Sequence, residues 1–158
     1  SADFVIIDTP GQMELFTLRE SSRLLVNALD PKSSVMIYLF DPIVSKTPSG
    51  YLSLLFMASS AIFRLQIPQV QVLSKSDVLS QEELTKIVSW STDPDILYND
   101  LKLERKTLSL ELFLLLQESG FFRPLIPASA ITNYGMEDIY DGIQELFFAG
   151  DDLEKVYF

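Results

Sequence analysis

Short apolar runs along the chain alternate with longer stretches in which apolar residues follow helical spacing. Four of these runs have the length and the β-branched or leucine-rich composition of strands in a parallel sheet. They cover residues 4–7, 34–40, 69–74 and 124–130. Helical spacing predicts helices over residues 12–29, 51–66 and 137–149, with further helices between residues 80 and 120. This alternation predicts an α/β fold, in which helices flank a parallel sheet with right-handed crossovers.

Residues 80–120 are predicted to form a helical insert between two of the strands. Residues 80–83, Ser-Gln-Glu-Glu, have the spacing of a capping box and predict the start of a helix. Pro94 is expected to end that helix, and a second helix is predicted from about residue 102 to residue 118. Within it, residues 110–116 are apolar on all sides. They indicate either a core helix or a groove for a dimer or another protein partner.

Composition limits the chemistry that is available to the chain. It has 158 residues, of which 47% are hydrophobic, enough for one domain spanning residues 1–158. A formal net charge of -10 opposes a general nucleic-acid or anionic-membrane surface. The lack of cysteine and histidine excludes disulfides, thiol chemistry, Ser-His-Asp triads and the usual zinc ligands. We therefore expect a cytoplasmic protein that uses carboxylates and amides, with no direct nucleic-acid or membrane contact.

The string Asp8-Thr9-Pro10-Gly11-Gln12 follows the first predicted strand and has the residue types of a phosphate site. A carboxylate at a strand end, here Asp8, can hold Mg²⁺ directly or through a water. Gly11 lets its N–H approach a terminal phosphate without a Cβ in the way. The Gln12 amide suits the orientation of an attacking water. The alternative is an ordinary strand-turn-helix corner with Asp8 as helix cap, but the whole string favours the phosphate site.

Residues 8–14 resemble the third guanine-nucleotide motif of the GPN-loop GTPases, a family of P-loop GTPases. A second string, Ser74-Lys75-Ser76-Asp77, is similar to the fourth GTPase motif, Asn-Lys-x-Asp, with serine in place of asparagine. A third, Ser129-Ala130, is similar to the fifth motif, in which a backbone N–H reaches the guanine O6. Together the three strings extend the resemblance along almost the whole chain.

The second string has a physical rationale for guanine. One carboxylate, Asp77, can accept both hydrogens of the N1–N2 edge of guanine, and Lys75 can lay its aliphatic stem along the purine. Adenine lacks that donor pair, and an unpaired buried carboxylate costs about 1–3 kcal/mol or more. The alternative is that Asp77 caps the next turn. Asp41, which follows the second predicted strand, is more simply interpreted as a turn aspartate before proline.

The resemblance also implies elements that these 158 residues do not contain. No P-loop and no Gly-Pro-Asn loop occurs in the sequence, and both precede the third motif in relatives. We therefore expect the C-terminal portion of a GTPase domain, P-loop NTPase-like and without its N-terminal P-loop strand. That strand would lie between the first and second predicted strands, so a gap in the sheet is expected. Weak or no GTP binding is expected of this chain alone.

The resemblance implies a GTP-binding protein that hydrolyses GTP with Mg²⁺ and acts as a homodimeric switch. Its implied site residues are Gln12 and Asp8 for catalysis, Asp8 for the metal, Gly11 and Thr9 for phosphate, and Lys75, Asp77, Ser129 and Ala130 for guanine. Two alternatives stay open. One is an assembly or chaperone-like factor whose nucleotide state controls protein binding, because eukaryotic relatives are linked to RNA polymerase assembly. The other is a related dimeric P-loop ATPase.

Overall fold

The computed structural model describes residues 4–9, 20–104 and 108–148. Its centre is a parallel three-stranded sheet of order β1-β2-β3. The strands are β1 (Met36–Phe40), β2 (Gln69–Leu73) and β3 (Leu125–Pro127). The helices are α2 (Glu20–Ala28), α3 (Pro48–Leu65), α4 (Gln81–Thr92), α5 (Pro94–Leu103), α6 (Leu110–Glu118) and α7 (Met136–Phe148), with 3-10 turns η1 (Pro31–Ser33), η2 (Val44–Lys46) and η3 (Ser76–Val78). The predicted α/β fold with a parallel sheet flanked by helices is confirmed.

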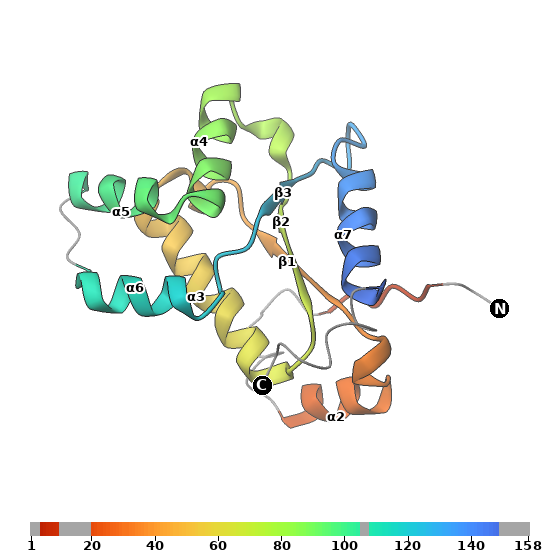
Figure 1. Cartoon of the computed structure of the whole chain (residues 1–158). Helices are drawn as coiled ribbons and strands as arrows, with labels where there is room; N and C mark the ends of the chain where they lie inside the picture. The colour runs from red at the N-terminus through yellow and green to blue at the C-terminus, as the bar shows by residue number, and fades with distance from the viewer. Residues whose placement is uncertain (1–3, 10–19, 105–107, 149–158) are drawn as a thin grey trace.

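Helices cover the two faces of the sheet unequally. Figure 1 shows α3 to α6 on one side of the strands and α7 on the other. The larger core lies on the α3 side, where Phe40, Tyr51 and Trp90 are fully buried and their rings follow one another at about 5.6 to 5.7 Å. On the other side, Val70 and Val72 pack against α7. Every residue of β2 is buried, as expected for a central strand with helices on both faces.

The insert contains three helices where two were predicted. Pro94 starts α5 instead of only ending α4, because the first helical position needs no N–H and suits the fixed φ of proline. Asp93 caps this helix by accepting the Asp95 N–H at 3.1 Å. The single helix predicted over residues 102–118 is wrong, since α5 ends at Leu103 and α6 begins after its own cap, Ser109. The predicted capping box at Ser80 is present.

Most residues at positions 110–116 of α6 are apolar, yet the helix is buried on one side only. Phe113 and Leu116 face the core. Leu110, Leu112 and Leu115 are exposed to solvent. The core interpretation therefore holds for one face of this helix, and the other face is an open apolar surface.

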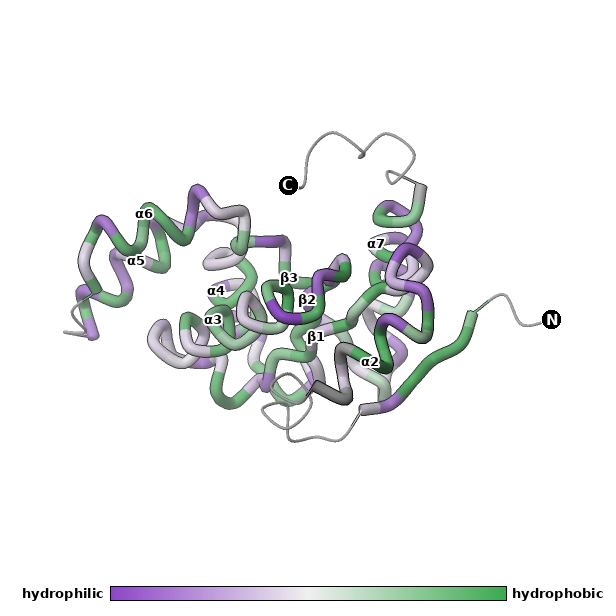
Figure 2. The backbone as a smooth tube through the Cα atoms, turned by 90° about the horizontal axis from the view of Figure 1, so that it is seen from below, coloured by the Kyte–Doolittle hydropathy of each residue, from purple (hydrophilic) through white to green (hydrophobic). Residues whose placement is uncertain are grey.

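The strand predicted over residues 4–7 is wrong in this structure. The residues pair with no strand of the described part, and their side chains are 46% to 93% exposed. Figure 2 shows this apolar segment at the rim of the molecule, away from the strands. Among the described residues, its ring contact is between Phe4 and Tyr140 of α7, with centroids 6.0 Å apart. A buried parallel strand needs ladder partners, and β1, the nearest in sequence, pairs with β2 and with no second strand of the described part.

Two further expectations are affected by which residues are described. Helix α2 confirms the second half of the helix predicted over residues 12–29, and residues 12–19 lie outside the described part. Among the described residues, no helix combines the length and the apolar character that a membrane span requires.

Candidate functional site

Loops from three strands meet at the carboxyl edge of the sheet, because parallel strands all end on the same side. Asp41 follows β1, the second GTPase-like string follows β2, and Ser129 with Ala130 follows β3. Crevices at this edge are the usual ligand sites of open α/β sheets. The fold therefore brings the predicted guanine-binding residues from β2 and β3 to one edge.

Hydrogen bonds hold the loop after β2 to both neighbouring strand ends. Ser74 donates its N–H and its hydroxyl to the Phe40 carbonyl oxygen, each at 3.1 Å. The Ser76 N–H donates to the Ala128 carbonyl oxygen at 2.9 Å. Serine at position 74, which departs from the asparagine of the motif, thus ties the loop to the end of β1. The second bond places the two predicted guanine-binding loops side by side.

Lys75 lies between these two anchors, and Asp77 lies between Ser76 and the start of α4. Lys75 adopts a left-handed backbone conformation with φ of 50° and starts the η3 turn. Asp77 is exposed, and its carboxylate accepts no hydrogen bond from the described part of the chain. The cap of α4 is Ser80. The alternative that Asp77 caps the next turn is therefore wrong, and the carboxylate is available to a ligand.

The loop after β3 is closed by its own hydrogen bonds. Buried Ser129 donates its N–H to the Tyr134 carbonyl oxygen at 3.0 Å, and its hydroxyl accepts the Thr132 N–H at 3.3 Å. Gly135 ends this turn with φ of +74°, and a Cβ there would lie 2.1 Å from the Pro127 carbonyl oxygen. Ala130 is exposed at the turn, and its N–H donates to no acceptor in the described residues.

Asp41 has the turn role that its sequence context favours. Its Oδ1 accepts the N–H groups of Ile43 and Val44 at 2.8 and 3.0 Å. Both bonds fix the turn that leads from β1 into α3. This carboxylate is therefore engaged by the backbone.

Of the predicted phosphate residues, the structure describes Asp8 and Thr9, and the segment that carries them lies away from this edge (Figure 1). Asp8 and Thr9 are exposed and have no hydrogen bond or ion pair with the described residues. Gly11 and Gln12 lie outside the described residues. Within 4–9, 20–104 and 108–148, no three acidic side chains gather in a way that could hold a metal ion. The fit of Mg²⁺ to Asp8 stays a prediction.

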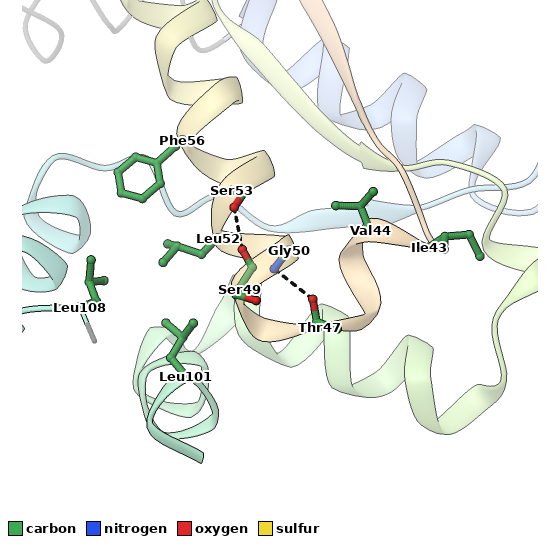
Figure 3. Close-up of a pocket in the computed structure, with 10 residues that line it drawn as sticks. All are labelled: Ile43, Val44, Thr47, Ser49, Gly50, Leu52, Ser53, Phe56, Leu101 and Leu108. Carbon is green, nitrogen blue, oxygen red and sulfur yellow. Dashed lines mark hydrogen bonds between the residues drawn. The ribbon is translucent and has the colours of Figure 1, made fainter. Parts of the chain in front are cut away.

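Sequence reasoning missed an apolar hollow of about 530 Å³ beside the β1–α3 connection. Figure 3 shows Leu52 and Phe56 of α3 facing Leu101 and Leu108 across it. At its polar end, the Ser49 N–H donates to the Glu104 carboxylate at 3.1 Å. Its walls come from residues 43–56 and from Leu101 and Leu108, which lie far apart in the sequence, so no local pattern predicts it.

The sequence is similar to known proteins over most of its length. Residues 1–149 match a family model described as a conserved hypothetical ATP binding protein. The chain is 33% identical over 141 residues to the GPN-loop GTPase PAB0955 of Pyrococcus abyssi, over 87% of this chain and 56% of that protein. It is 28% identical over 148 residues to the GPN-loop GTPase QQT2 of Arabidopsis thaliana, over 90% of this chain and 38% of that protein.

A solved structure shares the fold. The crystal structure of PAB0955, a GTPase in apo form, aligns with a TM-score of 0.70 and 30% identity, over 89% of this chain and 57% of that one. The fold is therefore of the P-loop GTPase class. Within that class, the chain belongs to the GPN-loop GTPase family. It spans between 38% and 56% of the length of the two relatives named above.

Proposed function

We propose that this chain carries the guanine-selecting part of a protein that binds and hydrolyses GTP. The observation that supports this most directly is the 2.9 Å hydrogen bond from the Ser76 N–H to the Ala128 carbonyl oxygen. It joins the loops of Asp77 and Ala130 while leaving the Asp77 carboxylate and the Ala130 N–H without partners among the described residues. Guanine offers two donors and one acceptor on its hydrogen-bonding edge. It therefore requires a free acceptor, here Asp77, next to a free donor, here the Ala130 N–H.

In this proposal each guanine-binding residue has one task. The Asp77 carboxylate accepts the N1 and N2 hydrogens, and the Ala130 N–H donates to O6. The Lys75 stem covers one face of the purine, and Ser129 holds the turn that presents Ala130. Adenine reverses the polarity at both N1 and C6, so it would set acceptor against acceptor and donor against donor. Selection for guanine follows from this mismatch.

Hydrolysis is proposed for the phosphate end of the site, to which residues 8–12 would contribute in a protein of greater length, since residues 4–9 do not lie at this edge in the present structure. Asp8 is proposed to organise Mg²⁺, Gly11 and Thr9 to contact phosphate, and Gln12 to orient the attacking water. Mg²⁺ would be held mainly by the phosphates and by water, as is usual in nucleotide sites. A homodimer whose nucleotide state acts as a switch is part of this proposal. Because the chain spans 56% of its Pyrococcus relative, turnover is proposed for a protein of that greater length.

Specific observations favour two other functions. ATP binding is supported by the description of the matching family model. An assembly or chaperone-like role is supported by the apolar hollow and by the exposed leucines of α6, which could receive an apolar segment of a protein partner. A partner connected with RNA polymerase assembly would fit the second role. That role and nucleotide binding are compatible in one molecule.

Calorimetric titration separates these functions. GTP, GDP and ATP with Mg²⁺ would be titrated into the 158-residue chain and into the longest polypeptide that its gene encodes. We expect guanine nucleotides to bind in preference to ATP, and more tightly to a polypeptide that also supplies a phosphate loop. Equal affinity for GTP and ATP would contradict the assignment of Asp77. No binding of either nucleotide by any form would leave the assembly role as the function to pursue.

A further inference from the structure

Residues 74–80, here called the guanine loop, are held at three points. At its entrance, Ser74 bonds to the Phe40 carbonyl oxygen, and in its middle the Ser76 N–H bonds to the Ala128 carbonyl oxygen. Both of these anchors are backbone carbonyl oxygens at strand ends. The exit of the loop is held differently, by the side chain of Glu83 in the first turn of α4.

The two carboxylate oxygens of Glu83 have different partners. Oε2 accepts the Ser80 N–H at 2.8 Å, and Ser80 returns a bond by accepting the Glu83 N–H at 3.2 Å. Oε1 accepts from Lys46 Nζ at 2.8 Å. Lys46 belongs to η2, on the connection that follows β1. One carboxylate thus joins the exit of the guanine loop to the connection that follows the neighbouring strand β1.

From this geometry we propose that Glu83 is a positioning residue for Asp77 in guanine recognition, with Lys46 as its support. The inference rests on the proposed function. Asp77 has no hydrogen bond of its own in the described part of the chain, so its place is set by the anchors at Ser76 and Ser80. Accepting two hydrogens from one base edge demands a carboxylate held within a fraction of an ångström.

The bond to Lys46 is what separates this role from ordinary helix capping. A capping box needs the Oε2 bond to the N-cap backbone and nothing more. The hydrogen bond from Lys46 has the largest effect in lowering the pKa of Glu83, and the Ser80 N–H has the next largest. Glu83 is therefore an anion at neutral pH and keeps both bonds.

Inosine triphosphate gives a readout that a purely structural role would not move. It lacks the N2 amine and so loses one of the two hydrogens offered to Asp77, while its phosphates are identical to those of GTP. The ratio of GTP to ITP affinity therefore reports the placement of Asp77 independently of the phosphate site. The titrations would use the longest polypeptide that the gene encodes.

We expect Glu83→Ala to lower the GTP-to-ITP preference by about threefold to tenfold, the range that follows from loss of one cap or hydrogen bond. Lys46→Met should lower the GTP-to-ITP preference less than Glu83→Ala does. Glu83→Gln should keep part of the preference that Glu83→Ala loses, because the glutamine amide oxygen can still accept the Ser80 N–H. Glu82→Ala is the matched control, since Glu82 is an exposed neighbour in the same helical turn with no side-chain partner in the described residues. It should leave the ratio unchanged.

Two outcomes would overturn different claims. If Glu83→Ala weakens GTP and ITP equally, so that the ratio stays at the wild-type value, Glu83 is a structural cap and the positioning role is wrong. If the wild-type protein has no preference for GTP over either ITP or ATP, the proposed function itself fails. Backbone ¹⁵N relaxation adds a test without nucleotide, since the amides of Asp77 and Val78 should lose order in Glu83→Ala and keep it in Glu82→Ala. Unchanged order in both variants would also contradict the positioning role.

Discussion

Two segments of this chain carry an aspartate that the sequence predicts to bind nucleotide or metal, and the structure packs the two segments differently. The guanine loop follows a strand buried on both faces and is tied to its neighbours by hydrogen bonds from Ser74 and Ser76. Residues 4–9 carry Asp8, pair with no strand of the described part and have one aromatic contact, from Phe4 to Tyr140. A motif at a strand end has a defined position only when the strand itself is paired. The hydrogen bonds to neighbouring strands and the helices packed on the sheet determine where the carboxyl end of the strand lies.

The largest expected effect is a difference in the free energy of unfolding between a substitution beside the guanine loop and one in residues 4–9. Phe40 ends β1, is fully buried among Tyr38 and Tyr51, and supplies the carbonyl that anchors the guanine loop. Phe40→Ala should reduce the free energy of unfolding by about 3–5 kcal/mol. Ile6→Ala, at a side chain that is 93% exposed, should change it by less than about 0.5 kcal/mol.

Urea unfolding of both variants measures the difference. A loss for Ile6→Ala that approaches the loss for Phe40→Ala would contradict the exposed position of residues 4–9. A small loss for Phe40→Ala would mean that the α3-side core does not support the guanine loop.

A second prediction concerns the turn that presents Ala130, and the chain supplies its own control. Gly135 and Gly120 have nearly the same left-handed φ, +74° and +72°. A Cβ at Gly135 would meet the Pro127 carbonyl oxygen at 2.1 Å, whereas a Cβ at Gly120 would meet nothing within 4 Å. Gly120→Ala should cost about 1 kcal/mol from the backbone conformation alone. Gly135→Ala should cost about 1–3 kcal/mol more, because the backbone must also move.

Thermal unfolding of the two variants gives the difference, and amide exchange of Ser129 localises it. Exchange at Ser129 should speed up in Gly135→Ala and stay at its normal rate in Gly120→Ala. Equal losses of stability in the two variants would show that the turn can relax around the added methyl group.

The smallest expected effect is the pH dependence contributed by Glu83. Lys46 and Ser80 hold its pKa below the ordinary value of 4.5. A carboxylate with a lowered folded-state pKa stabilises the fold above its unfolded-state pKa, and this contribution is lost as the pH falls through the folded-state pKa. The stability difference between the wild type and Glu83→Gln should therefore be constant near pH 7 and shrink below about pH 4.5. Urea unfolding from pH 7 to pH 3 tests this, and a difference that grows toward low pH would contradict it.

Local signals in the sequence predicted much of the described fold. Strands β1 and β2, the capping box at Ser80 and the cap role of Asp41 follow from residue types and spacing within a few positions. The prediction of two helices in the insert takes Pro94 only as a helix terminator, whereas proline is equally suited to the first position of a helix and starts α5 here. Ser109, the cap of α6, is the signal that could have divided the predicted helix.

Non-local partners account for the rest. The apolar run of residues 4–7 has the composition of a buried strand, yet no sequence pattern states what lies beside it. The apolar hollow forms where α3, Leu101 of α5 and Leu108 come together, and no pattern within one segment indicates this. For the site, the neighbourhood of Asp77 and Ala130 could be predicted from the parallel order of the strands. The hydrogen bond between Ser74 and Phe40 could not, because serine replaces the residue that the motif leads one to expect.

The central claim is that the Asp77 carboxylate selects guanine, and a single substitution tests it most directly. Asp77→Asn replaces one of two acceptors with a donor, which suits xanthine, whose C2 carries an oxygen in place of the amine. GTP affinity should fall by at least about tenfold, the loss expected for a hydrogen bond to a charged group, and affinity for xanthosine triphosphate should rise. Asp95→Asn, an equal change of charge at an exposed aspartate of α5, should alter neither. If Asp77→Asn binds GTP as the wild type does and gains nothing for xanthosine triphosphate, Asp77 does not read the base.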